Sequence, residues 1–344
     1  MAAYFARRFL LMIPTFLGIT FLVFAITRMV PGGPIEQMIL KTQMATAQEG
    51  GGTTSARGES GAGIPQEVLD QLKAHYHFDK PIVVAYGLWL GDLLTLNLGK
   101  SYKYNRPVLE TITGRFRVSI YFGLIGFLLA YLICIPLGIL KAIKHGGTFD
   151  FTSSVAVFMG YSIPGWALGA VLLVLLGGGS FWDVFPLGGF ESSDYDQLSL
   201  WGKVKDRAWH TVLPVIAYMV GSFATLTILM KNSLMENLGQ DYVRTAFAKG
   251  LSERRVVFVH AFRNSLIPLC TGLGHAVGLV MAGSYLIEKV FNIDGLGYLG
   301  YTSVIDRDYA VVMGVLVFNT FLVLLGNILS DVLYVIVDPR IRFQ

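Results

Sequence analysis

The chain has 344 residues, of which 53% are hydrophobic and only 15% charged, and its mean hydropathy is +0.57. Soluble domains carry roughly 25% charged residues, so the composition excludes a soluble globule, and it is too apolar for a disordered chain. Two cysteines exclude a disulfide-rich scaffold, and a net charge of +4 gives no indication of a nucleic-acid partner. The composition therefore predicts a polytopic membrane protein in contact with the lipid bilayer.

Six windows are long and apolar enough to cross a bilayer as helices, which requires about 20 residues each. None of them contains Asp, Glu, Lys or Arg, and they cover residues 9–27, 118–140, 151–176, 211–230, 265–287 and 309–330. The first follows Arg7 and Arg8 but ends without a small-residue cleavage site, so we interpret it as an uncleaved signal anchor. The expected fold is all-α with six transmembrane helices.

Lys and Arg near the helix ends predict the orientation. With a cytosolic N-terminus, the inside segments hold twelve of these residues and the short outside loops hold five. Positive residues concentrate on the cytosolic side. We therefore expect both termini inside and a large extracytosolic loop between helices 1 and 2.

The predicted organisation has three parts. Residues 1–29 form the N-terminal segment and anchor helix, 30–117 the large outside loop, and 118–344 the core of helices 2–6. Within the loop, 50–63 has the Gly/Ser-rich composition of a flexible linker. The segment 64–77 carries the start signal and apolar spacing of a short helix, and 82–94 has the pattern of a second amphipathic helix.

The inside segment 231–264 has the most informative pattern. Val243, Phe247 and Leu251 recur at intervals of four, which predicts a short helix with one apolar stripe. Gly250 can end that helix and Ser252 can cap a second one. The residues alone leave two interpretations open, a simple connection or a docking surface for a partner.

No motif indicates chemistry within the chain. The glycines of 295–300 fit G-x-G-x-x-G but lie in an outside loop, and Gly99-Lys100-Ser101 lacks the first glycine of a P-loop, so neither predicts a nucleotide site. His75 and His77 are a weak metal pair, and the role of His275 in the fifth window stays open. We find no nucleophile–base pair, and we expect no enzyme activity, cofactor or metal site. The stripe of Asn319, Asn327 and Asp331 predicts interhelical hydrogen bonds.

The segment 241–268 resembles the cytosolic coupling-loop motif of binding-protein-dependent ABC import permeases, in the oligopeptide/dipeptide/nickel branch. The family pattern E-A-A-x-x-x-G falls on Arg244, Thr245, Ala246 and Gly250, with departures at the Glu and the first Ala. Phe247 stands where the branch commonly has Arg. The residues that the resemblance assigns to ATPase coupling are Asp241, Arg244, Thr245, Ala246, Gly250, Leu251, Ser252 and Arg255.

Other segments resemble the same family over nearly the whole chain. Residues 4–8 resemble the N-terminal start of the family, and 31–34 resemble the segment where its first helix leaves the membrane. The 50–63 insertion together with 209–211 is most similar to Yej-type permeases. The outer-loop motif residues are Gly99, Ser101, Pro107, Glu288, Gly295, Gly297, Arg307, Asp308 and Tyr309. The C-terminal signature residues are Asp331, Asp338, Pro339 and Arg340.

The resemblance implies a type I ABC importer permease fold in the bacterial inner membrane. It also implies four kinds of partner: a second homologous permease, ABC ATPase subunits that hold ATP and Mg, a periplasmic peptide-binding protein, and a peptide-like substrate of the microcin C type. Nickel chelates, opines and oligosaccharides are alternative cargoes. A stand-alone channel or receptor is the alternative from a different functional class.

Overall fold

A computed structural model describes residues 2–29, 79–178, 181–270, 272–273, 278 and 283–337. These residues form helices joined by turns and loops, and the chain separates into two compact units. The first unit comprises Met1–Met12, Gly114–Leu299 and Asn319–Gln344, and the second comprises Ile13–Thr113 and Gly300–Phe318. The predictions made for 31–34, 50–63 and 64–77, and for His75, His77, His275, Asp338, Pro339 and Arg340, lie outside the described residues.

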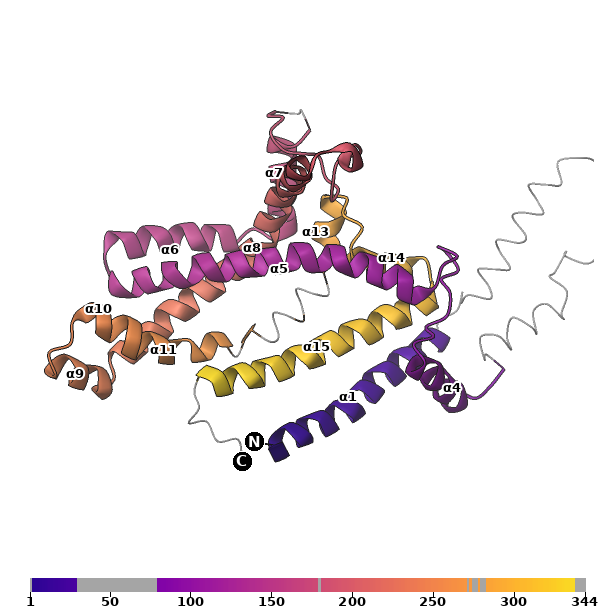
Figure 1. Ribbon diagram of the computed structural model, residues 1–344, viewed down its shortest axis with the longest axis horizontal. Helices are drawn as coiled ribbons and strands as arrows, with labels where there is room; N and C mark the ends of the chain where they lie inside the picture. The colour runs from indigo at the N-terminus through magenta and orange to yellow at the C-terminus, as the bar shows by residue number, and fades with distance from the viewer. Residues whose placement is uncertain are drawn as a thin grey trace, which may run out of the picture. The chain divides into compact units, whose positions relative to one another are not determined.

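The first unit is built on two long helices, α5 (Val108–Ile143, of which 114–143 lies in this unit) and α8 (Leu200–Leu238) (Figure 1). At 1.5 Å per residue they are about 54 and 58 Å long, well beyond the ~30 Å of a hydrocarbon core. Both helices therefore continue past the apolar windows. The segment 209–211 lies inside α8 rather than before it, and Lys231 belongs to the same helix.

The apolar window 151–176 is not one straight helix. It contains α6 (Thr148–Tyr161) and α7 (Gly165–Leu176), whose axes differ by 91°. Pro164 lies at the break with φ −54° and ψ 135°. Proline has no N–H to continue the helical ladder, and it pushes the preceding residue away from helical geometry. The expectation of a single helix here is wrong, although the bent pair together is long enough for one broken span.

Around α8 the first unit is a helical bundle. α8 packs against α6 and α7, and the short helix α13 (Tyr285–Val290) packs against both α7 and α8. An apolar cluster that includes Phe122, Leu213, Phe291 and Ile293 fills the space between these elements. The 3₁₀ turn η1 (Tyr195–Gln197) leads into α8, whose first residues are capped by Ser199 accepting a hydrogen bond from the Gly202 N–H.

The second unit joins α4 (Ile82–Leu94) to residues 13–29 of α1 (Ala2–Met29), and it also holds most of α14 (Leu296–Ile305) and the start of α15 (Tyr309–Val337). The Tyr86 hydroxyl donates to the Leu17 carbonyl at 3.0 Å and lies 2.8 Å from Thr20 Oγ1. Rings of Phe21 and Phe24 pack edge-on against Tyr86. The short helix predicted over 82–94 is confirmed, whereas α14 replaces part of the outside loop in which the glycines of 295–300 were expected.

Within the described part of the chain, four helices are long and apolar enough to span a membrane, or up to five if the bent pair counts as one span. They are Ala6–Met29, Val108–Ile143, Leu200–Leu238 and Tyr309–Leu333. The fifth predicted window, 265–287, includes residues outside the described ranges. The number six and the orientation therefore stay predictions.

Candidate functional site

The coupling segment, residues 240–255, forms a helix, a glycine break and a second short helix. α9 (Asp241–Ala248) begins after the extended Gln240 and carries Asp241 in its first turn, where a carboxylate favours the helix dipole. α10 (Glu253–Arg255) begins after Ser252, which is extended as a capping residue should be but whose side chain makes no capping hydrogen bond. The predicted helix–glycine–helix arrangement is confirmed.

Gly250 allows the chain to reverse between the two helices. Its φ is +76°, and the N–H groups of Gly250 and Leu251 donate to the carbonyls of Phe247 and Ala246 at 2.9 and 3.3 Å. These two bonds are the Schellman pattern, which requires a left-handed residue at this position. A residue with a side chain adopts that conformation at a cost of about 1–2 kcal/mol.

One face of the coupling segment is buried in an apolar cluster, which we call the seat. Val243 and Ala246 contribute to it from α9, and half-buried Leu251 packs against it. Its other buried members are Ile139 and Ala142 from α5, Met230 and Leu234 from α8, and Val256, Val257, Ala261 and Leu269. Phe247 was expected on the buried stripe but is 47% exposed. The buried face of α9 is centred between Val243 and Ala246, and Phe247 lies at the edge of that face.

The opposite face of the coupling segment is exposed. Of the residues predicted for ATPase coupling, Asp241, Arg244, Thr245, Gly250, Ser252 and Arg255 are exposed, whereas Ala246 is buried and Leu251 half-buried. Arg244 forms a 3.5 Å pair with Asp241, which adds little stability in water. The segment thus presents an aromatic and charged surface supported by an apolar base.

A six-residue π-helix, η2 (Val256–Ala261), links the coupling segment to α11 (Phe262–Ser265). π-Helical turns are rare and are frequent at functional sites. The sequence predicts an ordinary α-helix here, because no single residue type signals the π-helical pattern.

The outer-loop residues near position 100 meet those near 308 within the second unit. Asp308 Oδ2 accepts from Ser101 Oγ at 2.5 Å and from the Lys103 N–H at 3.4 Å, and its Oδ1 accepts from the Val311 N–H at 3.4 Å. Asp308 therefore caps α15, which begins at Tyr309. Residues 100 and 107 form an antiparallel bridge beside the left-handed Gly99, and Arg307 is left-handed as well. These contacts hold the two outer loops together, and we call this group of residues the clasp.

The carboxylates of this clasp affect a neighbouring phenol. Burial and the negative charges of Asp308 and Asp306 raise the pKa of Tyr102, whose hydroxyl donates to the Asp306 carbonyl. Tyr102 therefore stays a neutral hydrogen-bond donor across the physiological pH range.

We predict that Asp308→Ala destabilises the protein by about 1–3 kcal/mol, because it removes a helix cap and leaves the buried Ser101 hydroxyl without its acceptor. The measurement is thermal unfolding of the detergent-purified chain. Asp92→Ala, which removes an exposed carboxylate from α4 in the same unit, is the matched control. Equal unfolding temperatures for both variants would contradict the capping role.

A second outer-loop motif surrounds Glu288 in the first unit. The Glu288 side chain is 1% exposed and accepts hydrogen bonds from Ser119 Oγ at 2.8 Å and from the Tyr298 N–H at 2.6 Å. A Cβ atom at Gly295 would lie 2.4 Å from the Glu288 carboxyl group, so only glycine allows this approach. Gly297 is equally constrained, since its Cβ would meet the Tyr285 nitrogen at 2.8 Å.

Asp331, one residue of the C-terminal signature, meets Arg8 from the opening of the chain, although the two motifs lie far apart in the sequence. Asp331 is 4% exposed, and its carboxylate pairs with Arg8, whose Nε lies 3.0 Å from Oδ2 and whose Nη2 lies 3.1 Å from Oδ1. Arg8 Nε also donates to the Tyr4 hydroxyl at 3.1 Å. Within the polar stripe predicted on the last helix, Asp331 thus contacts a second helix, α1, through Arg8.

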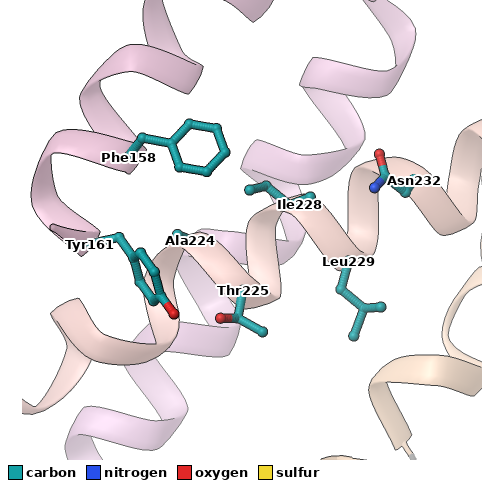
Figure 2. A pocket seen from close by; sticks show the side chains of 7 residues that line it. All are labelled: Phe158, Tyr161, Ala224, Thr225, Ile228, Leu229 and Asn232. Atoms are coloured by element: carbon teal, nitrogen blue, oxygen red, sulfur yellow. The ribbon is translucent and has the colours of Figure 1, made fainter.

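A shallow hollow lies between α6 and α8 in the first unit (Figure 2). Its volume is about 320 Å³, and its lining residues are Phe158, Tyr161, Ala224, Thr225, Ile228, Leu229 and Asn232. The walls combine aromatic and aliphatic surface with a phenol, a hydroxyl and an amide. Such a surface can contact apolar side chains and hydrogen-bond to amide groups.

Among the described residues, no group of three or more His, Cys, Asp or Glu side chains is arranged to hold a metal ion. Both cysteines are free and buried. The polar contacts described above hold loops and helix ends in place.

The comparisons with known proteins identify the family. A family model described as "Binding-protein-dependent transport system inner membrane component" matches residues 134–343, more than half of the chain. The chain belongs to this family. The resemblance drawn from the residues is thereby confirmed, and the chain is a permease subunit of a binding-protein-dependent ABC importer and a multi-pass membrane protein.

Curated relatives match the permease along its whole length. The "Peptidoglycan transport system permease protein YejB" of Agrobacterium fabrum (strain C58 / ATCC 33970) is 40% identical over 360 residues, covering 100% of this chain and 99% of the relative. The "Inner membrane ABC transporter permease protein YejB" of Escherichia coli O157:H7 is 39% identical, with 100% of both chains covered. The "Dipeptide transport system permease protein DppB" of Escherichia coli (strain K12) is 35% identical, again over 100% of both chains.

A solved structure shares the fold of the permease. A chain from the inward-facing MetNI methionine ABC transporter aligns with a TM-score of 0.51 and 18% identity, covering 67% of this chain and 97% of that chain. This likeness concerns the fold alone. It supports the predicted all-α permease architecture.

Proposed function

We propose that this chain is one of two membrane-spanning subunits of an ATP-driven importer for peptides or peptide-like compounds. It lies in the bacterial inner membrane as six helices with both termini in the cytosol. A second homologous permease, ABC ATPase subunits that bind ATP and Mg, and a periplasmic peptide-binding protein complete the complex. Movement of the ATPase subunits reaches this chain through the coupling segment and switches access to the cargo from outside to inside.

The seat of the coupling segment is the observation that carries this proposal. Val243 and Ala246 are buried against the ends of α5 and α8, so a displacement of α9 is passed directly to both long helices. The exposed face of α9 offers Tyr242, Arg244 and Phe247 to a partner. An exposed apolar and charged surface on a rigid base is the form that a docking site takes.

Peptide cargo is supported by the names of the relatives, which mention dipeptide and peptidoglycan transport. The hollow between α6 and α8 fits that chemistry, because it sets the amide of Asn232 and the phenol of Tyr161 among apolar walls. Peptide-like compounds of the microcin C type are the specific cargo class that we propose. Competition by nickel chelates, opines or oligosaccharides in the uptake assay would move the assignment to one of those classes.

The coupling role predicts that Gly250→Val abolishes most of the peptide uptake. Valine in the left-handed conformation costs about 1–2 kcal/mol, which is roughly a 5- to 30-fold change in the population of the correctly folded turn. No atom lies within 4 Å of a Cβ built at this position, so strain rather than a clash is tested. The measurement is ATP-dependent uptake of a labelled peptide by cells or proteoliposomes at equal expression.

Gly239→Val is the matched control. Gly239 ends α8 with φ −77°, which valine adopts freely, and a Cβ there meets the Glu236 carbonyl at an ordinary 3.4 Å. We expect its uptake to stay within about twofold of the parent.

Co-purification of the permease in detergent must also bring an ABC ATPase. Uptake or conduction without any ATPase bound would instead identify a stand-alone channel.

A further inference from the structure

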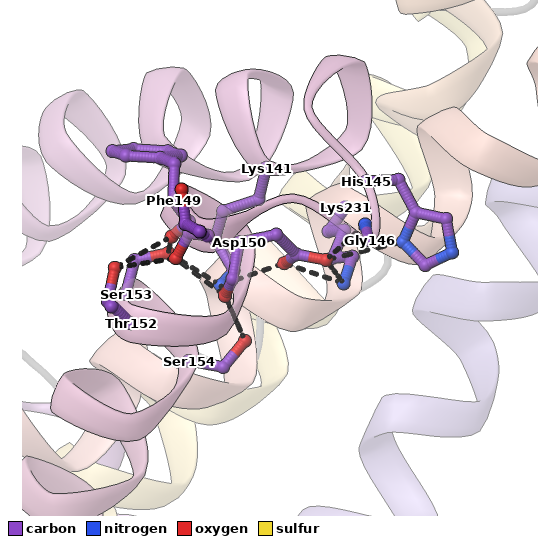
Figure 3. Close-up of polar contacts among 10 residues, drawn as sticks. Lys141, His145, Gly146, Phe149, Asp150, Thr152, Ser153, Ser154 and Lys231 are labelled. Carbon is purple, nitrogen blue, oxygen red and sulfur yellow. Dashed lines mark hydrogen bonds and ion pairs between the residues drawn. The ribbon is translucent and has the colours of Figure 1, made fainter.

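A cluster of charged side chains joins α5, α6 and α8 beside the seat (Figure 3). We call Lys141, Asp150 and Lys231 the ion cluster. Lys231 Nζ donates to both carboxylate oxygens of Asp150, at 2.8 and 2.7 Å. Lys141 Nζ lies 3.2 Å from Asp150 Oδ1 and donates to the Asp150 carbonyl at 2.9 Å. One residue of α6 thus bonds to both long helices.

The ion cluster is buried and its members are paired. The side chains of Lys141 and Asp150 are 1% and 8% exposed, and that of Lys231 is 15% exposed. Lys141 also donates to Ser153 Oγ and Ser154 Oγ at 2.8 and 2.7 Å. Burying charges costs free energy unless each is paired, so this geometry is held tightly. His145 is the further titratable side chain at the cluster, with Nδ1 3.3 Å from Asp150 Oδ2.

The two lysines stand next to residues of the seat. Lys141 lies between Ile139 and Ala142 on α5, and Lys231 follows Met230 on α8. The apolar neighbours hold the coupling segment, while the lysines hold α6. The same helical turns therefore make both connections.

α6 contributes no apolar side chain to the seat among the described residues. The described members of the seat come from α5, α8, the coupling segment and the residues that follow it, and none comes from α6. The contacts between α6 and α8 along the rest of their length include the hollow lined by Phe158 and Tyr161. Asp150 is the residue of α6 that bonds to both long helices at the level of the seat, so movement of the seat reaches the base of α6 at this point.

We propose that Asp150 is a positioning residue that makes α6 follow the coupling segment, so that the hollow between α6 and α8 changes shape when the ATPase subunits close. This proposal rests on the proposed function, and it names the contact through which movement of the coupling segment reaches α6. A purely structural ion pair would stabilise the fold without affecting how much cargo is moved for each ATP. A contact that transmits movement to α6, by contrast, determines how much peptide is taken up for each ATP hydrolysed.

The test uses the complete transporter in proteoliposomes and measures ATP hydrolysed and labelled peptide taken up. Asp150→Asn removes the charge that holds both lysines. Lys231→Met is the second variant, because it leaves Lys141 and Asp150 as a balanced pair and cuts only the link to α8. In both variants we expect ATP hydrolysis to persist while peptide uptake per ATP falls at least about fivefold, the lower end of measured coupling effects. Asp150→Glu should recover part of the ratio.

Lys144→Gln is the control, since Lys144 is exposed in the turn that follows α5. Its uptake per ATP should match the parent. An unchanged ratio in both test variants would overturn the proposal, and so would a loss of uptake and ATP hydrolysis in equal proportion together with a lowered unfolding temperature. Failure of the proposed function is recognised separately, because the parent complex would then show no ATP-dependent uptake at all.

Discussion

Replacing Ala246 by aspartate is expected to abolish ATP-driven uptake and to reduce co-purification of the ATPase by tenfold or more. Ala246 is 6% exposed and packs in the seat, so the new carboxylate would be buried among apolar groups without a partner. Burying an unpaired charge costs several kcal/mol, enough to release α9 from its base. Uptake, ATPase co-purification and the unfolding temperature of the purified chain are the measurements.

Two alanines provide controls for this variant. Ala248 lies on the same helix but is exposed, so Ala248→Asp should leave the unfolding temperature unchanged and affect only ATPase binding. Ala208 is exposed near the other end of α8, and Ala208→Asp should change neither property. An Ala246→Asp protein with normal uptake would show that the seat does not transmit force.

Replacing Gly138 by alanine is expected to destabilise the permease by about 1–3 kcal/mol, because added volume in a packed contact forces neighbouring groups apart. A Cβ at Gly138 would lie 2.6 Å from Met230 Cβ and 2.8 Å from the Thr227 carbonyl oxygen. The oxygen belongs to the α8 backbone, so α5 and α8 would have to separate. Thermal unfolding in detergent measures the effect.

Gly114→Ala in the same helix is the matched control. Its Cβ would meet no atom within 4 Å, and alanine is the better helix former by about 0.5–1 kcal/mol. The two glycine-to-alanine changes should therefore shift the unfolding temperature in opposite directions. Equal shifts would mean that the close contact between α5 and α8 does not contribute to stability.

Helices whose signals are local could be predicted from the sequence. The limits of α4 follow from an apolar run after Pro81, and the reversal at Gly250 follows from a residue type that tolerates positive φ. The apolar windows identified α1, α5, α8 and α15 because hydrocarbon demands uninterrupted apolar length. The predicted ends of these helices were less accurate, because polar residues such as Lys231 extend the helix beyond the apolar window.

Features that depend on tertiary contacts could not be predicted. Asp150 precedes an apolar window, and Lys141 and Lys231 were counted only as indicators of orientation, yet the three meet across 90 residues of sequence. Likewise, the motif residues Ser101 and Asp308 lie 207 residues apart in the sequence and meet only in the fold. A periodicity of four placed Phe247 on the buried face, whereas the actual packing selects Val243 and Ala246.

Pro214 lies within the long helix α8. Proline removes one backbone hydrogen bond, and helices bend at such points. From Pro214 to Leu238 the helix measures about 36 Å, so bending it by about ten degrees at Pro214 would move the Leu238 end through an arc of about 6 Å. That arc is close to the length of two residues of an extended peptide. A small angular change at Pro214 is thus magnified, at the end of α8 next to the coupling segment, to the scale of a dipeptide.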